Sequence, residues 1–281
     1  YKRPAEWGPP RATWLAWPHH ETDWPGKCEP IHCVYAEIAR VIAMHEPVES
    51  LCQSQEVAEA ARAKLTAHEA RLDQIRLHVV PTDRVWLRDS APIGVQDAGG
   101  DVVLLDWKFN AWAKYDNWAL DDRVGTAIAS ITGLRREEPR RPDSERIVLE
   151  SGGIDVNGDG LLLVTEEWLL SDVQVRNPGL SRQDYEHIFA EWLGVDRTIW
   201  LGEGCVGDDT HGPLSAEHLA SASRTDEFID RWRAPGDSRP RSWEERFGEV
   251  KYLPLADDAW KAALDAAIGQ ASEPAAAPSA A

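Results

Sequence analysis

Short apolar runs alternate along the chain with segments whose apolar residues recur at helical spacing, from residue 12 to residue 201. Helical spacing predicts a helix, and a short apolar run bounded by Gly, Pro or polar residues predicts a strand. Helices are expected over 30–46, 55–72, 121–131 and 181–193, the last capped by Ser181. Strands are expected over 12–17, 48–52, 75–80, 102–107, 147–149, 161–165 and 199–201. This alternation predicts an α/β fold and leaves open one sheet or several small ones.

The pattern changes after Gly212. Residues 213–271 are expected to be mostly helix and loop, with one strand over 250–255. The Ala/Pro/Ser-rich end, 272–281, is expected to be a disordered tail. Because the chain starts with Tyr1, its start is expected to lie upstream or to have been trimmed.

Composition and charge exclude several classes of protein. Hydrophobic residues make up 43% and charged residues 28%, which allows a packed core and argues against global disorder. The net charge of −18 would repel phosphate backbones, so no nucleic-acid partner is expected. No apolar run is long enough to span a bilayer, so no membrane partner is expected. Four cysteines without a secretory signal favour a cytoplasmic location.

The segment 83–92, directly after an expected strand, concentrates acids, arginines and a tryptophan. The carboxylate of Asp89 could accept two parallel N–H bonds from a planar guanidinium. Trp86 could supply a stacking face for the same cation. The alternative is an internal Arg–Asp ion pair at a strand end, and from the residues alone this is the simpler interpretation.

Residues 155–160, followed after five residues by Glu166, match the calcium loop of an EF-hand. That loop needs a helix on each side, whereas apolar runs over 147–149 and 161–165 flank it here. Asn157 and Gly158 also form a hairpin-turn signal. A β-hairpin is therefore expected, and a calcium-binding module is kept as a remote alternative.

The cysteines offer weak candidate sites. Cys28 and Cys33 flank His32 and could form a metal clip, but a lone pair at this spacing is more often two free thiols. Cys205 lies just before two aspartates, whose charge would raise the pKa of the thiol and weaken it as a nucleophile.

A series of short motifs runs in order from residue 4 to residue 212. They are Pro4-Ala5-Glu6-Trp7, Thr13-Trp14-Leu15-Ala16-Trp17-Pro18, Asp23-Trp24-Pro25-Gly26, Trp86-Leu87-Arg88-Asp89, Asp106-Trp107-Lys108-Phe109-Asn110-Ala111-Trp112, Glu150-Ser151-Gly152-Gly153-Ile154, Thr165-Glu166-Glu167, Arg176-Asn177-Pro178 and Gly207-Asp208-Asp209-Thr210-His211-Gly212. In order and approximate spacing they resemble the agmatine deiminase and bacterial peptidylarginine deiminase family.

The resemblance implies a pentein-like α/β propeller of ββαβ units, incomplete here on its C-terminal side. Residues 1–212 would be a partial pentein catalytic domain and 213–271 a diverged or frame-shifted segment. Members of the family convert a guanidinium group to a ureido group and release ammonia, turning agmatine into N-carbamoylputrescine for polyamine synthesis or peptidyl arginine into citrulline. No metal or other cofactor is implied, and a homo-oligomer is allowed.

In the family a Cys thiolate attacks, a His moves protons and two Asp side chains hold the guanidinium nitrogens. By resemblance, Asp89 is the first of these aspartates, with Trp86 and Arg88 beside the substrate. Glu150 matches the catalytic-site Glu that tunes the His, and is expected to face the same cavity as Asp89.

The rest of the family's catalytic set is not recognisable. Pro213 stands where the His is expected and Ser215 where the second Asp is expected, and no cysteine follows Cys205. The chain as written is therefore predicted to lack activity. The alternative is a non-catalytic guanidine-binding pseudoenzyme.

Overall fold

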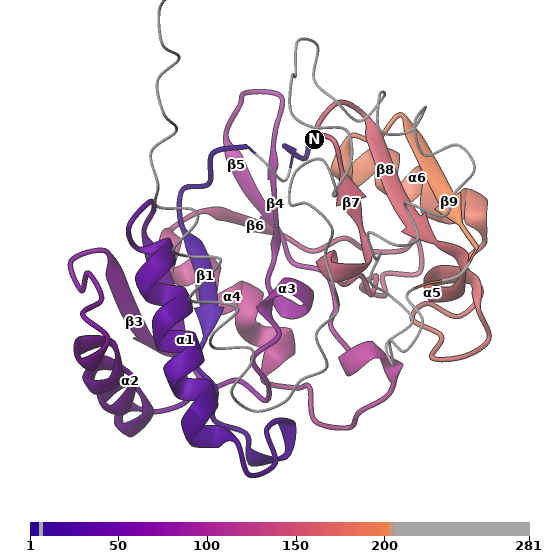
Figure 1. Ribbon diagram of the computed structural model, residues 1–281. Coiled ribbons are helices and arrows are strands. Elements are labelled where there is room, and N and C mark those ends of the chain that lie inside the picture. The colour runs from indigo at the N-terminus through magenta and orange to yellow at the C-terminus, as the bar shows by residue number, and fades with distance from the viewer. Residues whose placement is uncertain (6–7, 203, 205–281) are drawn as a thin grey trace, which may run out of the picture. The chain divides into compact units, whose positions relative to one another are not determined.

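Strands form three separate three-stranded sheets in the part of the chain that the computed structural model describes, residues 1–5, 8–202 and 204 (Figure 1). These residues all belong to one unit of the chain, Tyr1–Trp232. A single continuous parallel sheet is thus ruled out for them. The sequence had left open one sheet or several, and the structure shows several. Residues 205–281, with the expected strand 250–255 and the expected tail, lie outside the described residues.

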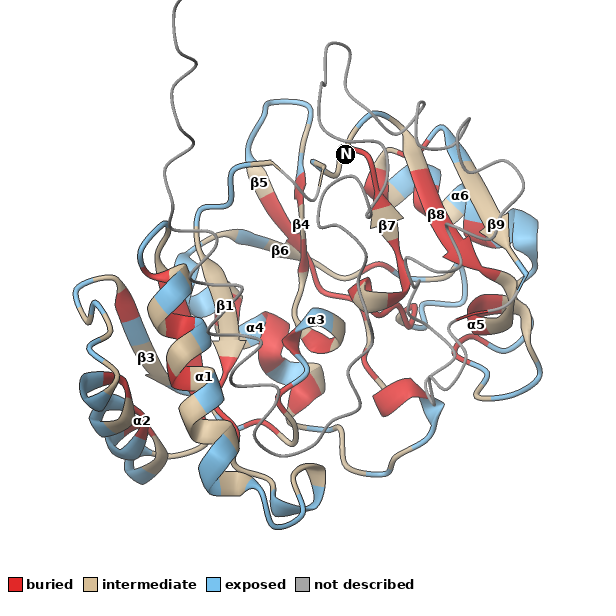
Figure 2. Cartoon of the chain, viewed as in Figure 1, coloured by how far each residue is buried: buried red, intermediate tan, exposed pale blue. Residues whose placement is uncertain are grey.

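The first sheet is wholly parallel. It consists of β1 (Thr13–Ala16), β2 (Val48–Cys52) and β3 (Ile75–Val79), in that order. Parallel neighbours need crossover connections, and here α1 (Cys28–Ile42) and α2 (Gln55–Ala67) supply them. Both helices turn buried alanines toward the sheet (Figure 2). The small side chains let the helices pack closely against the strands. The outward positions of α2 are mostly polar, whereas α1 also exposes Val34, Ile38 and Val41.

The second and third sheets repeat one ββαβ order. In the second, β4 (Ile93–Gln96) and β5 (Val102–Leu105) form an antiparallel hairpin, and β6 (Arg135–Glu137) returns parallel to β5 after α4 (Val124–Thr132). In the third, the corresponding elements are β7 (Asp155–Val156), β8 (Leu161–Thr165), α6 (Arg182–Leu193) and β9 (Arg197–Leu201). The shorter helices, all placed between these elements, are η1 (Glu21–Asp23), α3 (Leu87–Ser90), η2 (Ala111–Ala113), η3 (Asp121–Arg123), η4 (Ser151–Gly153) and α5 (Glu166–Leu170).

The middle strand of each sheet is its most buried one, because it is covered on both faces. One apolar cluster joins β4 and β5 to β7, β8 and α6, so the second and third sheets share a core. Another joins the first sheet to the second through Leu51, Leu104 and Val124. The three sheets are therefore linked by side-chain packing, with no strand pairing between them.

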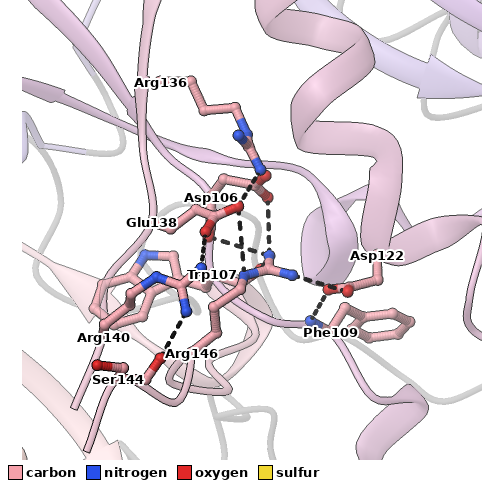
Figure 3. A network of polar contacts seen from close by, with 9 residues as sticks. All are labelled: Asp106, Trp107, Phe109, Asp122, Arg136, Glu138, Arg140, Ser144 and Arg146. Atoms are coloured by element: carbon pink, nitrogen blue, oxygen red, sulfur yellow. Dashed lines mark hydrogen bonds and ion pairs between the residues drawn. The ribbon is translucent and has the colours of Figure 1, made fainter. Parts of the chain in front are cut away.

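A charged network supports the end of the second sheet (Figure 3). Asp106, which directly follows β5, is 1% exposed, and it accepts a hydrogen bond from Arg136 Nε at 2.6 Å. Arg146 donates to Asp122 Oδ2 at 2.8 Å and to the backbone oxygen of Trp107 at 3.0 Å. Burial raises the pKa of Asp106, and the two guanidiniums oppose that shift. The network ties β5, β6, η3 and the segment around Arg146 together.

Several predicted elements are confirmed and some need correction. Helix α6 begins after Ser181, which forms a reciprocal capping box with Asp184. The helix expected over 55–72 ends at Ala67, since Glu69 takes a left-handed backbone with φ 56°. The strand expected over 147–149 is wrong. Only Val148 makes a bridge, to Lys108.

The segment matching a calcium loop is a hairpin connection, as expected, but its first strand is β7 and not 147–149. Gly158 and Gly160 take left-handed backbones, with φ of 73° and 80°, and Asn157 Oδ1 accepts from the N–H groups of Asp159 and Leu161. Strands flank the loop where an EF-hand requires helices. Among residues 1–5, 8–202 and 204, no group of three or more His, Cys, Asp or Glu side chains is placed to hold a metal ion.

None of the helices that the structure describes combines the length and the apolar character needed to cross a membrane.

Candidate active site

Asp89 lies on α3, a single helical turn. The turn is anchored by Leu87, which is buried, and by Ser90, whose hydroxyl donates to the backbone oxygen of Trp86 at 3.2 Å. Pro92 disfavours a helical conformation for the residue before it, and Ala91 is extended, so the helix ends there. Asp89 is thereby presented from a short, well-anchored turn and stays partly buried.

The Gly-rich segment η4 packs directly against α3. Ser151 Oγ donates to the backbone oxygen of Arg88, and the Gly152 N–H donates to the carboxylate of Asp89. A Cβ atom at Gly152 would lie 2.2 Å from Asp89 Oδ1, so this close approach requires glycine. Asp89 and Glu150 are thus brought together, although they are far apart in sequence.

Glu150 directly precedes η4 and is 2% exposed. One carboxylate oxygen accepts from Trp168 Nε1 at 2.9 Å and the other from Arg176 Nε at 3.0 Å. A Cβ atom at Gly153 would lie 2.6 Å from the ring of Trp168, so the second glycine of the segment lets the indole reach Glu150. Both oxygens of the buried carboxylate therefore have a fixed partner, as a buried charge requires.

The negative charge of Glu150 acts on the carboxyl group of Asp89. Burial first, and then the negative charge of Glu150, raise the pKa of Asp89 to about 7. The charges of Arg88 and Arg176 and the hydrogen bond from Gly152 act in the opposite direction. A carboxyl group whose pKa lies near 7, next to a second carboxylate, is typical of functional sites. The place where the two groups meet is suited to a cation.

The remaining predicted site residues lie on the same turn. Trp86 precedes α3 and is 42% exposed. Its ring centroid lies 6.0 Å from that of Trp24. Arg88 is exposed, and its positive charge lowers the pKa of Asp89, which preserves part of the internal Arg–Asp interaction that the residues alone had favoured.

Sequence reasoning missed the residues that hold Glu150. Arg176 and Trp168 were seen only as parts of, or neighbours to, family-like motifs, and neither had a role. The only signal in the sequence was Arg176 within the motif Arg176-Asn177-Pro178. Its partner Glu150 lies 26 positions away, and no local pattern predicts that pairing.

None of the cysteines in the described region lies on α3 or η4, the turns on or next to which Asp89 and Glu150 are placed. Cys28 and Cys33 are free thiols. Among the described residues they belong to no group of three or more His, Cys, Asp or Glu side chains that could hold a metal ion. Cys52 is buried in the first sheet, which raises the pKa of its thiol to about 11. Such a thiol is almost wholly protonated at neutral pH and is a poor nucleophile. Cys205, Pro213 and Ser215 lie outside the described residues.

Comparison with known proteins gives one consistent family. Residues 2–235 match the model of the Porphyromonas-type peptidyl-arginine deiminase family. The agmatine deiminase of Ectopseudomonas mendocina (strain ymp) is 39% identical over 237 residues, which are 83% of this chain and 60% of the relative. The agmatine deiminase of Stutzerimonas stutzeri (strain A1501) is 40% identical over 239 residues, with the same shares. The chain thus spans about 60% of the length of these curated relatives.

Solved structures that superpose on this chain come from the same kind of protein as the curated relatives. An agmatine deiminase of Enterococcus faecalis superposes with a TM-score of 0.67 at 29% identity, covering 75% of this chain and 56% of that one. An agmatine deiminase variant of C. jejuni with substrate bound superposes with a TM-score of 0.63 at 26% identity, covering 75% and 59%.

Proposed function

The chain belongs to the Porphyromonas-type peptidyl-arginine deiminase family, and on that basis we propose that it carries the guanidinium-binding part of a hydrolase that converts a guanidinium to a ureido group. Ammonia is the second product. The observation that carries the proposal is Asp89, a carboxyl group with a pKa of about 7 held by the Gly152 N–H next to Glu150. As a carboxylate it can accept two parallel N–H bonds from a planar cation.

The proposed substrate is agmatine. The curated relatives at about 40% identity are named agmatine deiminases, while the family model is named for peptidyl arginine. Peptidyl arginine therefore stays the second candidate substrate. With agmatine, the product would be N-carbamoylputrescine, in a cytoplasmic pathway toward polyamines.

The proposal extends to the fold and domain. The ββαβ order shared by the second and third sheets is the unit expected of a pentein propeller. Residues 1–212 would contribute such units to a catalytic domain. The remainder of the family's catalytic set would come from sequence that is not recognisable in this chain after Gly212.

In this scheme Asp89 orients the guanidinium, with Trp86 and Arg88 beside it. Glu150 lies near the bound cation, and Arg176 and Trp168 fix both of its oxygens. Orienting a planar substrate in advance lowers the entropic cost of reaction. A guanidine-binding pseudoenzyme would share every one of these contacts and differ only in releasing no ammonia.

Calorimetric titration with agmatine tests the binding step, and putrescine, which lacks the guanidinium, serves as the control ligand. We expect agmatine to bind better than putrescine, and Asp89→Asn to remove that preference. Asp73→Asn, at a carboxyl that is 65% exposed, is the matched control and should change nothing. Equal binding of agmatine by the wild type and by Asp89→Asn would refute the assigned role. Ammonia release from a fusion that carries a relative's C-terminal segment after Gly212 then separates the enzyme from the pseudoenzyme.

A further inference from the structure

Two indole rings from distant segments lie together next to α3. Trp24 and Trp86 have ring centroids 6.0 Å apart and planes tilted by 33°. Trp86 is 42% exposed, and Trp24 packs partly buried on the cluster that contains Val85 and Leu87. Trp24 therefore extends the aromatic surface of Trp86 on the side supported by the core.

Arg84 holds the two tryptophan-bearing segments together. Its guanidinium forms an ion pair with Asp23, the residue directly before Trp24. It also donates to Asn117 Oδ1 at 3.1 Å and lies over the ring of Tyr115, 4.3 Å from the centroid. The side chains of Arg84 and Asp23 are only 11% and 5% exposed.

The backbone leading to Trp86 is fixed separately. Asp121 Oδ1 accepts hydrogen bonds from the N–H groups of Asp83 and Arg84, at 2.8 and 3.2 Å. Asp83 Oδ2 in turn accepts from the N–H of Leu120 at 2.8 Å. These backbone contacts hold the segment before Trp86 and do not involve the Arg84 side chain. The ion pair of that side chain with Asp23 therefore positions the segment that carries Trp24.

A buried ion pair is a poor source of stability, because removing two charges from water offsets most of their attraction. Its more useful effect is to fix one geometry. Here the pair joins residues next to Trp24 and close to Trp86, and Asp23 neutralises the positive charge that would otherwise repel a cation. Both consequences favour a cationic ligand on the indole faces.

We propose that Trp24 and Trp86 together form an aromatic face for the cationic substrate that Asp89 binds, with Arg84, acting through Asp23, as the positioning residue of that face. The inference rests on the proposed function and deepens it. Indoles are the aromatic side chains that attract guanidinium and ammonium groups most strongly. Trp24 is then a direct contact for the substrate, whereas Arg84 touches only the residues that place it.

Circular dichroism tests the geometry without any ligand. Two indoles this close couple their transitions, so the difference spectrum between wild type and Trp24→Phe should show an exciton couplet. Arg84→Met should lose the same couplet, since Trp24 is released from Trp86. Arg71→Met is the matched control, because Arg71 and its partner Asp73 are 54% and 65% exposed. A couplet that survives Arg84→Met in folded protein would overturn the positioning role.

Binding tests the ligand. Agmatine and butylammonium should each bind about tenfold more weakly to Arg84→Met and to Trp24→Phe, with Arg71→Met unchanged. The double variant should be no weaker than either single variant, because both changes remove the same face. Unchanged affinity in Trp24→Phe, a conservative change that keeps a ring in the core, would overturn the inference.

The outcomes also separate this inference from the proposed function. If butylammonium binds with the expected dependence on Trp24 but agmatine does not bind, the aromatic face is supported and the guanidine function fails. If agmatine binds through Asp89 with no loss in Trp24→Phe or Arg84→Met, the function stands and the aromatic face is refuted. If neither cation binds, both are refuted.

Discussion

At the scale of single residues, the placement of Asp89 depends on a position without a side chain. Gly152 approaches Asp89 so closely that an added Cβ atom would lie 2.2 Å from Oδ1. The same approach delivers the N–H that bonds the carboxylate. One backbone position therefore sets both the location and the charge preference of the proposed cation-binding group.

Gly152→Ala should displace the Asp89 carboxylate, since the two atoms cannot both keep their places. We expect agmatine affinity to fall at least about tenfold and the free energy of unfolding to drop by about 1–3 kcal/mol, the usual cost of forcing extra volume into a packed site. Calorimetry and urea unfolding measure the two effects. Gly94→Ala is the control, because a Cβ atom there meets nothing within 4 Å. Normal agmatine binding by Gly152→Ala would contradict the close contact.

The pKa of about 7 predicts a pH dependence for Asp89. Only the carboxylate binds a guanidinium well, so agmatine affinity should rise with pH through about 7 and level off above it. Well below 7 it should fall about tenfold per pH unit, as expected for one linked proton. Titration calorimetry at several pH values measures this, with pH-independent weak binding expected for Asp89→Asn. An affinity that is flat between pH 5 and about 8 would show that the pKa is not raised.

Stability should change in the opposite direction. The folded protein holds the Asp89 proton more tightly than the unfolded chain, whose carboxyl keeps its usual value of 3.8. This contribution is fully present below 3.8 and is lost as pH rises through about 7. Asp121, also raised to about 7 by burial, acts in the same direction. The difference between wild type and Asp89→Asn in urea unfolding isolates the part that belongs to Asp89.

Sequence alone supplied part of this site. Asp89 and the Gly-rich segment after Glu150 were predicted, because both lie in short motifs whose residue order carries the resemblance. Arg176 and Trp168 were not, since their bonds to Glu150 depend on how β8, α5 and the following loop fold back. Partners created by tertiary packing leave no local pattern in the chain.

At the scale of elements, the network around Asp106 substitutes for long strands. Strand β6 has three residues and polar side chains, yet it pairs in parallel with β5. Arg136, on this strand, bonds Asp106 at the end of β5. Arg146 reaches from a later segment to Asp122 and to the backbone after β5 (Figure 3).

Arg146→Met should therefore be strongly destabilising. Its guanidinium is 15% exposed and lies between two acids, of which Asp106 is almost fully buried. Removing one partner of a buried charge group costs about 3–5 kcal/mol. Arg140→Met, in the same network but 47% exposed, should cost less than about 1 kcal/mol. Urea unfolding of the two variants compares them directly, and equal losses would show that burial does not govern the network.

The errors in element prediction have the same origin. Residues 147–149 have the composition of a strand, but Asn177 occupies the position of a neighbouring strand. Its side-chain amide accepts from the Val148 N–H at 2.9 Å and donates to the Val148 oxygen at 2.8 Å. Strand β6 was missed for the opposite reason, because its polar sequence becomes a strand only when β5 offers backbone partners. The long periodic helices and the buried central strands were predictable because packing and local pattern agree there.

At the scale of the whole chain, the described residues supply binding groups, and the turns α3 and η4, on or next to which those groups lie, contain no cysteine. Cys52 is buried in the core of the first sheet, and this burial raises the pKa of its thiol to about 11. Cys28 and Cys33 lie on α1, a different element from the α3 and η4 turns that carry Asp89 and Glu150. The sequence beyond Cys205 contains no cysteine at all.

The chain as printed is predicted to bind agmatine and to release no significant ammonia from it. A guanidinium carbon is a poor electrophile, because its positive charge is shared over three nitrogens, so attack needs a thiolate and the departing ammonia needs a proton donor. Pro213 and Ser215 stand where the family resemblance places the His and the second Asp. Proline has no titratable group, and serine carries no charge to clamp the substrate. Losing one member of such a set typically costs several orders of magnitude.

The measurement is ammonia and ureido-product release from agmatine and from peptidyl arginine, at protein concentrations high enough to detect slow turnover. Binding without turnover is the expected result. Turnover that disappears in Cys205→Ala would contradict it and would mean that the reaction uses a different cysteine from the family's. Turnover that survives this change but disappears in Cys33→Ala would instead identify Cys33, on α1, as the nucleophile. Fusing a relative's C-terminal segment after Gly212 should restore activity, and Asp89→Asn in that fusion should abolish it again, because the thiolate would then attack a substrate that nothing orients.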